Sequence, residues 1–289
     1  MSSQLNPDRD HGPVPRRVLL VGCGKVGIGL ASRLIAPGWE IFALRRSSEE
    51  LPAFVSPLRV DLLNPDMGPL PEVEAMVLTV TPSIGGEERP DGYLTALENL
   101  AGALPSVPSR VVFVSSTGVF DSEDSPCLIT EADLPGPATA RGRRLHDGEI
   151  LAERLFDAHI VRPAGIYGPG REMLPRKVTE GKAVQYARRT NRIHQDDLIA
   201  TLVAMLTTSR PPRMLHAVDG HSAPLGDVVT AIADELGLAP PPRIEPEKAS
   251  GKVFGGSALR EFLGSLRYDS YREGYRQIIA LQDGPSADP

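Results

Sequence analysis

Cysteine is scarce in this chain, whose 289 residues include only two, Cys23 and Cys127. Two thiols cannot form the disulfide framework of a small secreted domain, and they are too few for a cysteine-based metal cluster. Their scarcity favours the cytoplasm as the compartment. The length allows one large α/β domain, or one such domain with a small appended lobe.

Long hydrophobic runs and an excess of basic residues are missing as well. No apolar stretch approaches the roughly 18 residues that a membrane-spanning helix needs. Residues 1–15 and 282–289 are polar, and we expect them to be tails without fixed structure. The net charge is −6. These absences leave a globular protein for which neither nucleic acid nor a membrane is an expected partner.

A glycine-rich stretch near the start of the chain is its most informative feature. An apolar run over residues 18–21 ends at Gly22, and Gly22, Gly24 and Gly27 complete the pattern G-x-G-x-x-G before a helical pattern begins. Strand, glycine turn and helix in this order typically bind a dinucleotide pyrophosphate at the positive end of the helix. A tight turn without a ligand is the alternative. The turn residues expected to bind the cofactor are Gly22, Gly24, Lys25, Val26 and Gly27.

The end of the second expected strand, residues 39–44, indicates which dinucleotide binds. An NAD site usually has an acidic residue there, about 20 residues past the glycines, to bind the ribose 2′-hydroxyl. Here Arg45 and Arg46 follow the strand, and Glu40 lies at its other end. Because a guanidinium can bind a 2′-phosphate with paired hydrogen bonds, Arg45 and Arg46 favour NADP. NAD remains the alternative, with the two arginines as a solvated pair.

Strands alternate with helices along the chain, which predicts an α/β fold: a Rossmann-type doubly wound parallel sheet with a small C-terminal substrate lobe. Further strands are expected over residues 57–62, 75–80, 111–114, 160–162 and 214–218, and helices over 93–104, 139–157, 196–207, 225–236, 257–263 and 271–281. We expect an NAD(P)-binding core over 16–170, and a lobe over 171–281 that includes part of the core sheet. Gly237 is expected to end the helix over residues 225–236.

Four further motifs accompany the glycine turn. They are Val60-Asp61-Leu62, SSTGVF at 115–120, VRPAGIYGPGR at 161–171 and NRIHQDDL at 191–198. In this order and spacing, over residues 17–280, the chain resembles the extended and atypical short-chain dehydrogenase/reductase superfamily of NAD-dependent epimerases and dehydratases. Within that superfamily it is most similar to the YeeZ-like group of epimerase/dehydratase-type oxidoreductases.

The resemblance implies roles for single residues. Asp61 and Leu62 would lie near the adenine. Thr81 and Pro82, at which the fourth strand ends, would also bind the cofactor. Ser116 takes the catalytic serine or threonine position, where a hydroxyl can hydrogen-bond a substrate carbonyl. Its alternative role is to close a strand end. Asn99 falls where the family has an asparagine on its fourth helix, although a surface asparagine is an equal alternative.

The chain departs from the family at the catalytic pair Tyr-x-x-x-Lys. Counted from Ser116, this pair should fall near residues 141 and 145, where the chain reads Arg141-Gly-Arg-Arg-Leu145, and no tyrosine occurs between 94 and 166. An arginine can stabilise an oxyanion but is a poor proton donor near neutral pH. Tyr167 is another candidate acid. Histidine in general suits proton transfer near neutral pH, but a lone histidine on a helix, such as His146, is more often a surface or packing residue. The catalytic candidates are Ser116, Tyr167 and Arg141.

Other residues near the expected cleft suggest a charged substrate. An anionic group could meet arginines at 171, 188, 189 and 192, although scattered arginines are commonly solvated. Asp196 or Asp197 is expected to cap the following helix, and His194 is expected to be structural.

Two functions remain open. One is an NADP-dependent oxidoreductase that acts on a small polar carbonyl or sugar-like, anionic substrate. The other is a non-catalytic NADP-binding redox sensor or regulatory protein, which the missing pair favours. An epimerase of the usual kind needs the tyrosine. The resemblance also allows a homodimer, because long helices of the family often pair.

Overall fold

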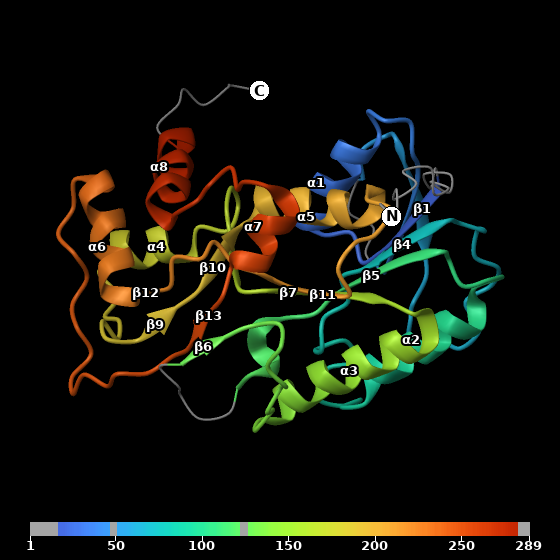
Figure 1. The fold of residues 1–289 in the computed structure, drawn as a ribbon, viewed down its shortest axis with the longest axis horizontal. Coiled ribbons are helices and arrows are strands. Elements are labelled where there is room, and N and C mark those ends of the chain that lie inside the picture. The colour runs from blue at the N-terminus through green and yellow to red at the C-terminus, as the bar shows by residue number, and fades with distance from the viewer. Residues whose placement is uncertain (1–16, 47–50, 122–126, 283–289) are drawn as a thin grey trace, which may run out of the picture.

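The computed structural model describes residues 17–46, 51–121 and 127–282. A seven-stranded parallel sheet forms its centre, in the order β11-β7-β5-β4-β1-β2-β3 (Figure 1). The predicted doubly wound α/β fold is therefore confirmed. The chain builds outward from β1 to β3 and then continues on the other side of β1, so the strand order reverses between β1 and β4, where ligands of such sheets bind. The strands are β1 (Arg17–Val21), β2 (Glu40–Arg45), β3 (Val55–Arg59), β4 (Ala75–Leu78), β5 (Arg110–Val114), β7 (His159–Pro163) and β11 (Met214–Ala217).

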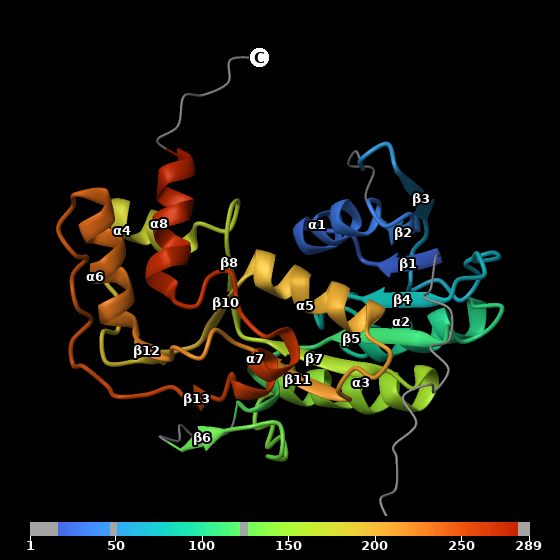
Figure 2. The ribbon, with the colours of Figure 1, turned by 45° about the horizontal axis from the view of Figure 1, so that its top comes forward.

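Helices cover both faces of this sheet. Helices α1 (Lys25–Leu34) and α5 (Gln195–Thr207) pack on one face, and α2 (Gly92–Ala103) and α3 (Ala140–Phe156) pack on the other (Figure 2). Successive residues of β1 point alternately into the two layers, so Val18 and Leu20 join one core cluster while Leu19 and Val21 join the other. This two-sided burial explains why the strands are almost continuously apolar.

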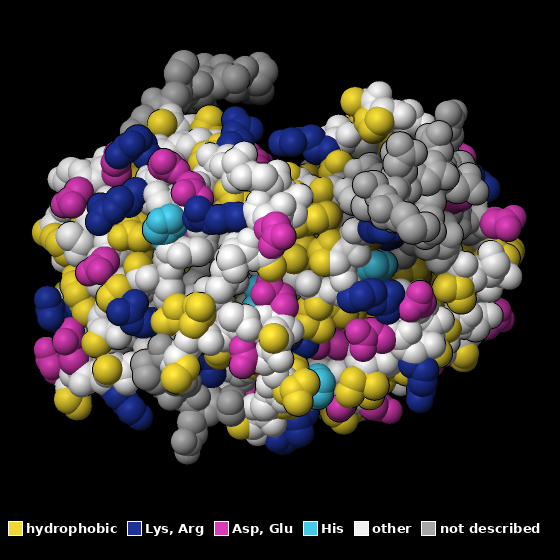
Figure 3. Space-filling view, viewed as in Figure 1, with side chains coloured by type: hydrophobic (Ala, Val, Ile, Leu, Met, Phe, Trp, Pro, Cys, Tyr) yellow, Lys and Arg dark blue, Asp and Glu magenta, His cyan; other side chains and the backbone are white. Residues whose placement is uncertain are grey.

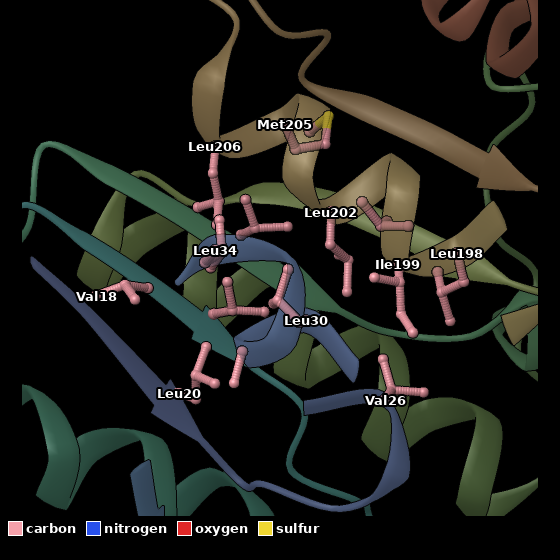
Figure 4. Packing of buried hydrophobic residues seen from close by; sticks show 14 of the residues in the cluster. Val18, Leu20, Val26, Leu30, Leu34, Leu198, Ile199, Leu202, Met205 and Leu206 are labelled. Carbon is pink, nitrogen blue, oxygen red and sulfur yellow. The ribbon is translucent and has the colours of Figure 1, made fainter. Parts of the chain in front are cut away.

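The packing of α1 against α5 fixes the helix that follows the glycine turn. Leu30 and Leu34 of α1 lie against Leu202 and Leu206 of α5, above Leu20 of β1 (Figure 4). Although α5 lies beyond residue 171, it therefore belongs to the core layer, and so does β11, which extends the core sheet. The stretch 171–281 thus contributes to both the core and the lobe.

The lobe is built on three helices with a hydrophobic core of their own. Helices α4 (Met173–Thr179), α6 (Leu225–Leu236) and α8 (Tyr271–Gln282) gather at the left of Figure 1, and Val178, Ile232 and Ile278 are buried among them. As predicted, α6 ends at Gly237, with φ +65°. The short elements are η1 (Thr117–Val119), β6 (Leu128–Ile129), β8 (Gly165–Tyr167), β9 (Arg189–Thr190), β10 (Arg192–His194), β12 (Ala223–Pro224), β13 (Val253–Phe254) and α7 (Ser257–Leu263).

The third strand differs from its prediction over residues 57–62. It begins at Val55, which pairs with Ile41, and it ends at Arg59. Beyond it Asp61 forms a turn, in which its Oδ1 accepts a hydrogen bond from the Leu63 amide at 3.1 Å. Asp side chains favour such turns over strands, so Asp61 and Leu62 follow the strand instead of lying within it. The short α4 and the small strand pairs of the lobe were not predicted.

The described part of the chain contains no helix that is both long and apolar enough to span a membrane. On the face shown in Figure 3, lysine and arginine side chains are mixed with aspartate and glutamate. The described residues on this face therefore form no continuous basic field of the kind that nucleic acids bind.

Candidate functional site

The glycine turn between β1 and α1 has the geometry that the sequence predicts. Gly22 has φ +85°, and a Cβ on it would lie 2.8 Å from Thr79 Oγ1. A Cβ on Gly27 would lie 3.2 Å from the Gly22 carbonyl oxygen, whereas one on Gly24 would meet nothing within 4 Å. Gly24 is the N-cap residue of α1 and has no side chain with which to cap the helix, and the first turn of α1 has no acidic residue. The positive end of α1 thus faces open space with no side chain neutralising it.

This open space belongs to a cavity of about 900 Å³, here called the central cleft. It lies at the carboxyl ends of β1, β4 and β5, beside the reversal of strand order, and the N-terminal part of α3 forms its opposite wall. The site residues predicted from the sequence that line it are Gly22, Gly24, Lys25, Val26, Gly27, Thr81, Pro82, Ser116 and Arg141.

Ser116 and Arg141 come together in the central cleft from different elements. Ser116 caps η1, because its Oγ accepts a hydrogen bond from the Gly118 amide at 3.0 Å. The position that a Cβ on Gly118 would occupy lies 3.3 Å from Ser116 Oγ and 3.4 Å from Arg141 Nη1. Since the Oγ of Ser116 accepts here, its own hydrogen is free to be donated elsewhere. A neutral donor and a permanent cation thus flank one point of the cleft.

The positions that correspond to the Tyr-x-x-x-Lys pair both face the central cleft. They are occupied by Arg141 and Leu145, one helical turn apart on α3, and Leu145 is buried. Among the described residues that line the cleft there is no tyrosine, histidine, cysteine, aspartate or glutamate. The charged side chains there are Lys25, Arg141, Arg144 and Arg171. The described lining therefore favours anions and offers no ordinary general acid.

Tyr167 does not join Ser116 and Arg141. It lies on β8 in the core of the lobe, 3% exposed, with ring centroids 5.2 Å from His194 and 4.7 Å from Tyr275. Burial, followed by the charge of Asp219, raises the pKa of Tyr167 above its ordinary value. A phenol whose pKa is raised holds its proton more firmly. Its geometry thus suits a hydrogen-bond donor in the lobe rather than an acid at the reacting carbon.

A second cavity of about 960 Å³, here called the lobe cavity, adjoins the central cleft. Gly165, Ile166 and Arg171 line both cavities, so the two share part of their walls at these residues. Tyr167 Oη and Arg192 Nη1 are buried and have no hydrogen-bond partner among the described residues. The Tyr167 hydroxyl lies against Gly274 of α8, where a Cβ would overlap it. The charged residues of the lining are Arg171, Glu172, Arg176, Lys177, Arg188 and Arg192; Arg189 is not among them.

The arginines after the second strand lie outside the central cleft. Arg45 ends β2, half-buried, and its charge is close enough to the glycine turn to act on the pKa of Cys23, which burial raises. Arg46 is exposed. In the sheet Arg45 pairs with Arg59 of β3, a residue that the sequence did not single out. Three arginines thus meet at the carboxyl ends of β2 and β3, where neighbouring parallel strands end together.

Asn99 ties α2 to the turn after β3. Its Nδ2 donates a hydrogen bond to the carbonyl oxygen of Leu62 at 2.9 Å. Leu62 is buried and Asp61 is exposed. Asn99 therefore holds the segment that would lie near an adenine, and it is not a free surface residue. His146 lies on α3, 3.8 Å from the Glu149 carboxylate, and it does not line the central cleft.

The expected capping of α5 by Asp196 or Asp197 is wrong. His194 is the cap, because its Nδ1 accepts from the Asp196 amide at 3.2 Å. Asp197 instead accepts from the amides of Arg267 and Tyr268 at 2.7 and 3.1 Å. Burial lowers the pKa of His194 to about 4. The ring thus stays neutral and can accept at Nδ1. His194 is structural, as predicted.

His216 on β11 gives the stability of this region a pH dependence. Its ring is fully buried, 5.6 Å from Phe120 and 5.5 Å from Phe254, and neither nitrogen has a partner among the described residues. Burial, followed by the charge of Arg162, lowers its pKa to about 4. Between pH 6.5 and 4 the unfolded chain binds a proton that the folded chain does not. The free energy of unfolding should therefore fall as the pH drops below about 6.5.

We expect His216→Phe to remove this part of the acid sensitivity. Between pH 7 and pH 5 the variant should lose about 2 kcal/mol less stability than the wild type, since 1.5 pH units at 1.36 kcal/mol lie inside the window. Urea unfolding at both pH values measures this difference. Leu134→Gln, a change at an exposed side chain that does not titrate, is the control and should behave like the wild type. Equal losses in His216→Phe and the wild type would contradict the prediction.

The fold and site define a class: a Rossmann-type α/β protein with a small lobe beside its glycine turn. No family model matches the chain. It is 27% identical over 265 residues to Protein YeeZ of Escherichia coli K12, covering 86% of this chain and 94% of that protein. It is also 25% identical to a dTDP-4-dehydrorhamnose reductase of Mycolicibacterium smegmatis, covering 98% of this chain and 92% of the reductase.

Among solved structures, a protein of Methylobacillus flagellatus assigned as an NAD-dependent epimerase/dehydratase is 30% identical, with a TM-score of 0.77. The match covers 92% of this chain and 98% of that protein. The chain belongs to the NAD-dependent epimerase/dehydratase family, within the extended short-chain dehydrogenase/reductase superfamily. The resemblance of its motifs to the YeeZ-like group is confirmed. Within the described residues, no group of three or more His, Cys, Asp or Glu side chains could hold a metal ion.

Proposed function

We propose that this protein is an NADP-dependent oxidoreductase acting on a small, polar, anionic carbonyl compound of sugar-like type. One observation carries the proposal. The glycine turn and the pair Ser116 and Arg141 face the same cleft at the reversal of strand order, and Arg171 joins this cleft to a cationic cavity. In this proposal residues 16–170 form the cofactor-binding core, apart from β8, whose Tyr167 packs into the lobe. The lobe comes from 171–281, apart from α5, α7 and β11, which pack with the core.

The glycine turn fits a dinucleotide. The open space at Gly24 leaves room for a pyrophosphate next to the first turn of α1, which carries no acidic side chain. Arg45, Arg46 and Arg59 would meet a 2′-phosphate at the ends of β2 and β3. Asp61, Leu62, Thr81 and Pro82 complete the cofactor site in this proposal.

Held at the glycine turn, NADPH would supply a hydride for the carbonyl carbon, and the protein would stabilise the oxygen that becomes negative. Ser116 would donate a hydrogen bond to that oxygen, and Arg141 would provide a permanent positive charge beside it. Arg141 does not replace the tyrosine that is the proton donor of the family, because a guanidinium cannot give up its proton near neutral pH. In this scheme water supplies the proton that converts the oxyanion to the alcohol.

The lobe cavity would hold the anionic part of the substrate. Arg176, Lys177 and Arg188 give its lining a positive charge, which favours an anionic group. Arg171 would contact the substrate where the two cavities meet. A carboxylate or phosphate bound there would fix the carbonyl in the central cleft.

A second candidate function is a non-catalytic NADP-binding sensor. The presence of Arg141 and Leu145 in place of the tyrosine and lysine favours it, as does the lack of a titratable acid among the described residues of the cleft. A panel of anionic and neutral carbonyl compounds separates the two functions. The oxidoreductase consumes NADPH with some member of the panel, and a sensor binds NADPH tightly and oxidises none of it.

Calorimetric titration of the protein with NADPH and NADH tests the cofactor. We expect NADPH to bind at least about tenfold more tightly, which is about 1.4 kcal/mol. The variant Arg45→Ser, Arg59→Ser should bring the two affinities to within about threefold by weakening NADPH alone, because only NADPH carries the 2′-phosphate. Arg33→Ser, on the exposed last turn of α1, should change neither affinity.

Each outcome of this titration has a definite meaning. Equal affinities in the wild type would refute the NADP assignment and favour NAD. If neither dinucleotide binds, the glycine turn is only architectural and the oxidoreductase proposal fails.

A further inference from the structure

Lys25 stands at an unfavourable place for a cation. It is the first residue of α1, and the first turn of this helix holds no acidic residue to balance it. The N-terminal end of a helix is positive and favours anions. A residue that breaks a local rule of this kind often lies at a functional site. An anion bound at the glycine turn would turn the unfavourable charge into a favourable one.

Lys25 also makes a contact with the segment that leads from the core into the lobe. Its Nζ donates a hydrogen bond to the carbonyl oxygen of Gly170, 145 residues away. A Cβ on Gly170 would overlap this amine, so the glycine allows the approach. Gly170 has φ +75°, and it belongs to a turn in which the Arg171 amide donates to the Gly168 carbonyl at 2.9 Å. The segment of residues 168–172 is here called the bridging turn.

The bridging turn carries Arg171, the charged residue through which the central cleft and the lobe cavity meet. Lys25 and Arg171 both line the central cleft. A ligand that fixes the Lys25 amine therefore also acts on the position of Arg171. The backbone of the bridging turn connects Lys25 to Arg171.

We infer that Lys25 joins the pyrophosphate of the bound cofactor to the Gly170 carbonyl, and thereby holds the bridging turn over the cofactor with Arg171 in place. An ammonium has three donors, so it can keep the carbonyl while it binds a phosphate oxygen. This role rests on the proposed cofactor function and extends it. Lys25 is a positioning residue. Through it, a bound cofactor raises the affinity of the lobe cavity for an anion, and by linkage a bound anion raises the affinity for the cofactor by the same factor.

Hydrogen exchange with and without saturating NADPH tests this role, read on peptides that cover residues 165–177. In the wild type we expect NADPH to slow exchange in the bridging turn at least about fivefold. In Lys25→Met the affinity for NADPH should fall about tenfold, and saturating NADPH should leave exchange in the bridging turn unchanged. Lys25→Arg keeps the charge and should recover most of the slowing. Arg33→Met removes a charge from the exposed far end of α1 and should behave like the wild type.

The possible outcomes separate this inference from the function on which it rests. If the wild type binds no NADPH, the proposed function fails. If the wild type binds NADPH and Lys25→Met still slows exchange in the bridging turn as the wild type does, the bridge is refuted while the proposed function stands. The bridge is likewise refuted, and the proposed function stands, if NADPH binds to the wild type without slowing exchange in the bridging turn.

Discussion

Replacing Glu149 with alanine is expected to lower the free energy of unfolding by about 4 kcal/mol, because it leaves a buried guanidinium without its partner. Glu149 on α3 and Arg162 on β7 form a two-point ion pair, with Nε–Oε1 and Nη2–Oε2 distances of 2.9 and 2.7 Å. Both side chains are almost completely buried, 3% and 2% exposed. The Arg162 guanidinium also lies over the ring of Phe120, 5.2 Å from its centroid. Water therefore cannot easily replace the lost carboxylate.

A double variant separates the cost of an uncompensated charge from the value of the pair. Replacing a whole buried ion pair by apolar residues of similar volume is often neutral or stabilising. Glu149→Leu combined with Arg162→Met should therefore recover most of the stability that Glu149→Ala loses. Urea unfolding of the wild type and both variants at pH 7 measures this. A loss below about 1 kcal/mol in Glu149→Ala would mean that the charge of Arg162 reaches solvent or another partner.

The predictable part of this protein is local in sequence. The strand before Gly22, the turn and α1 follow one another without interruption, so periodicity and glycine spacing predict all three. The cap of α5 was mispredicted for a physical reason. Aspartates are common caps, but Asp197 meets the amides of residues 267 and 268 instead. Only the folded chain brings these residues to the start of α5.

The site residues that escaped prediction depend on which strands are neighbours. Arg59 meets Arg45 because β3 pairs with β2 in a particular register, and the sequence of neither strand specifies that register. From the sequence, Tyr167 is predicted to be a residue of the cleft. The pairing of β8 with β10, which sets Tyr167 opposite His194, turns its ring into the lobe. That Arg171 lines both cavities likewise depends on the placement of the lobe.

Residues 141 and 145 show what the sequence can establish about the site. Motif spacing from Ser116 predicted that these two positions lie beside it, and both line the central cleft. The family resemblance, counted from Ser116, therefore located this wall of the cleft even though the residues there are not those of the family. The chemistry that follows from Arg141 and Leu145 depends on charge and proton affinity, which is why the proposed reaction relies on a cation and on water.

Gly24 offers a variant in which stability and cofactor binding should change in opposite directions. Its backbone, at φ −84° and ψ −160°, is allowed to any residue, and a side chain there would meet nothing within 4 Å. Aspartate is among the best residues for the start of a helix, and its charge suits the positive end. Gly24→Asp should therefore leave the free energy of unfolding unchanged or raise it by up to about 1 kcal/mol.

The same side chain would occupy the space through which a pyrophosphate must approach, and it would add a negative charge there. We expect the affinity of Gly24→Asp for NADPH to fall at least about 100-fold, which is about 2.7 kcal/mol. Calorimetric titration and urea unfolding of one preparation measure both effects. Gly102→Asp is the control, because its side chain also meets open space but lies on α2, outside the central cleft. If Gly24→Asp binds NADPH as the wild type does, the cofactor does not lie against the glycine turn.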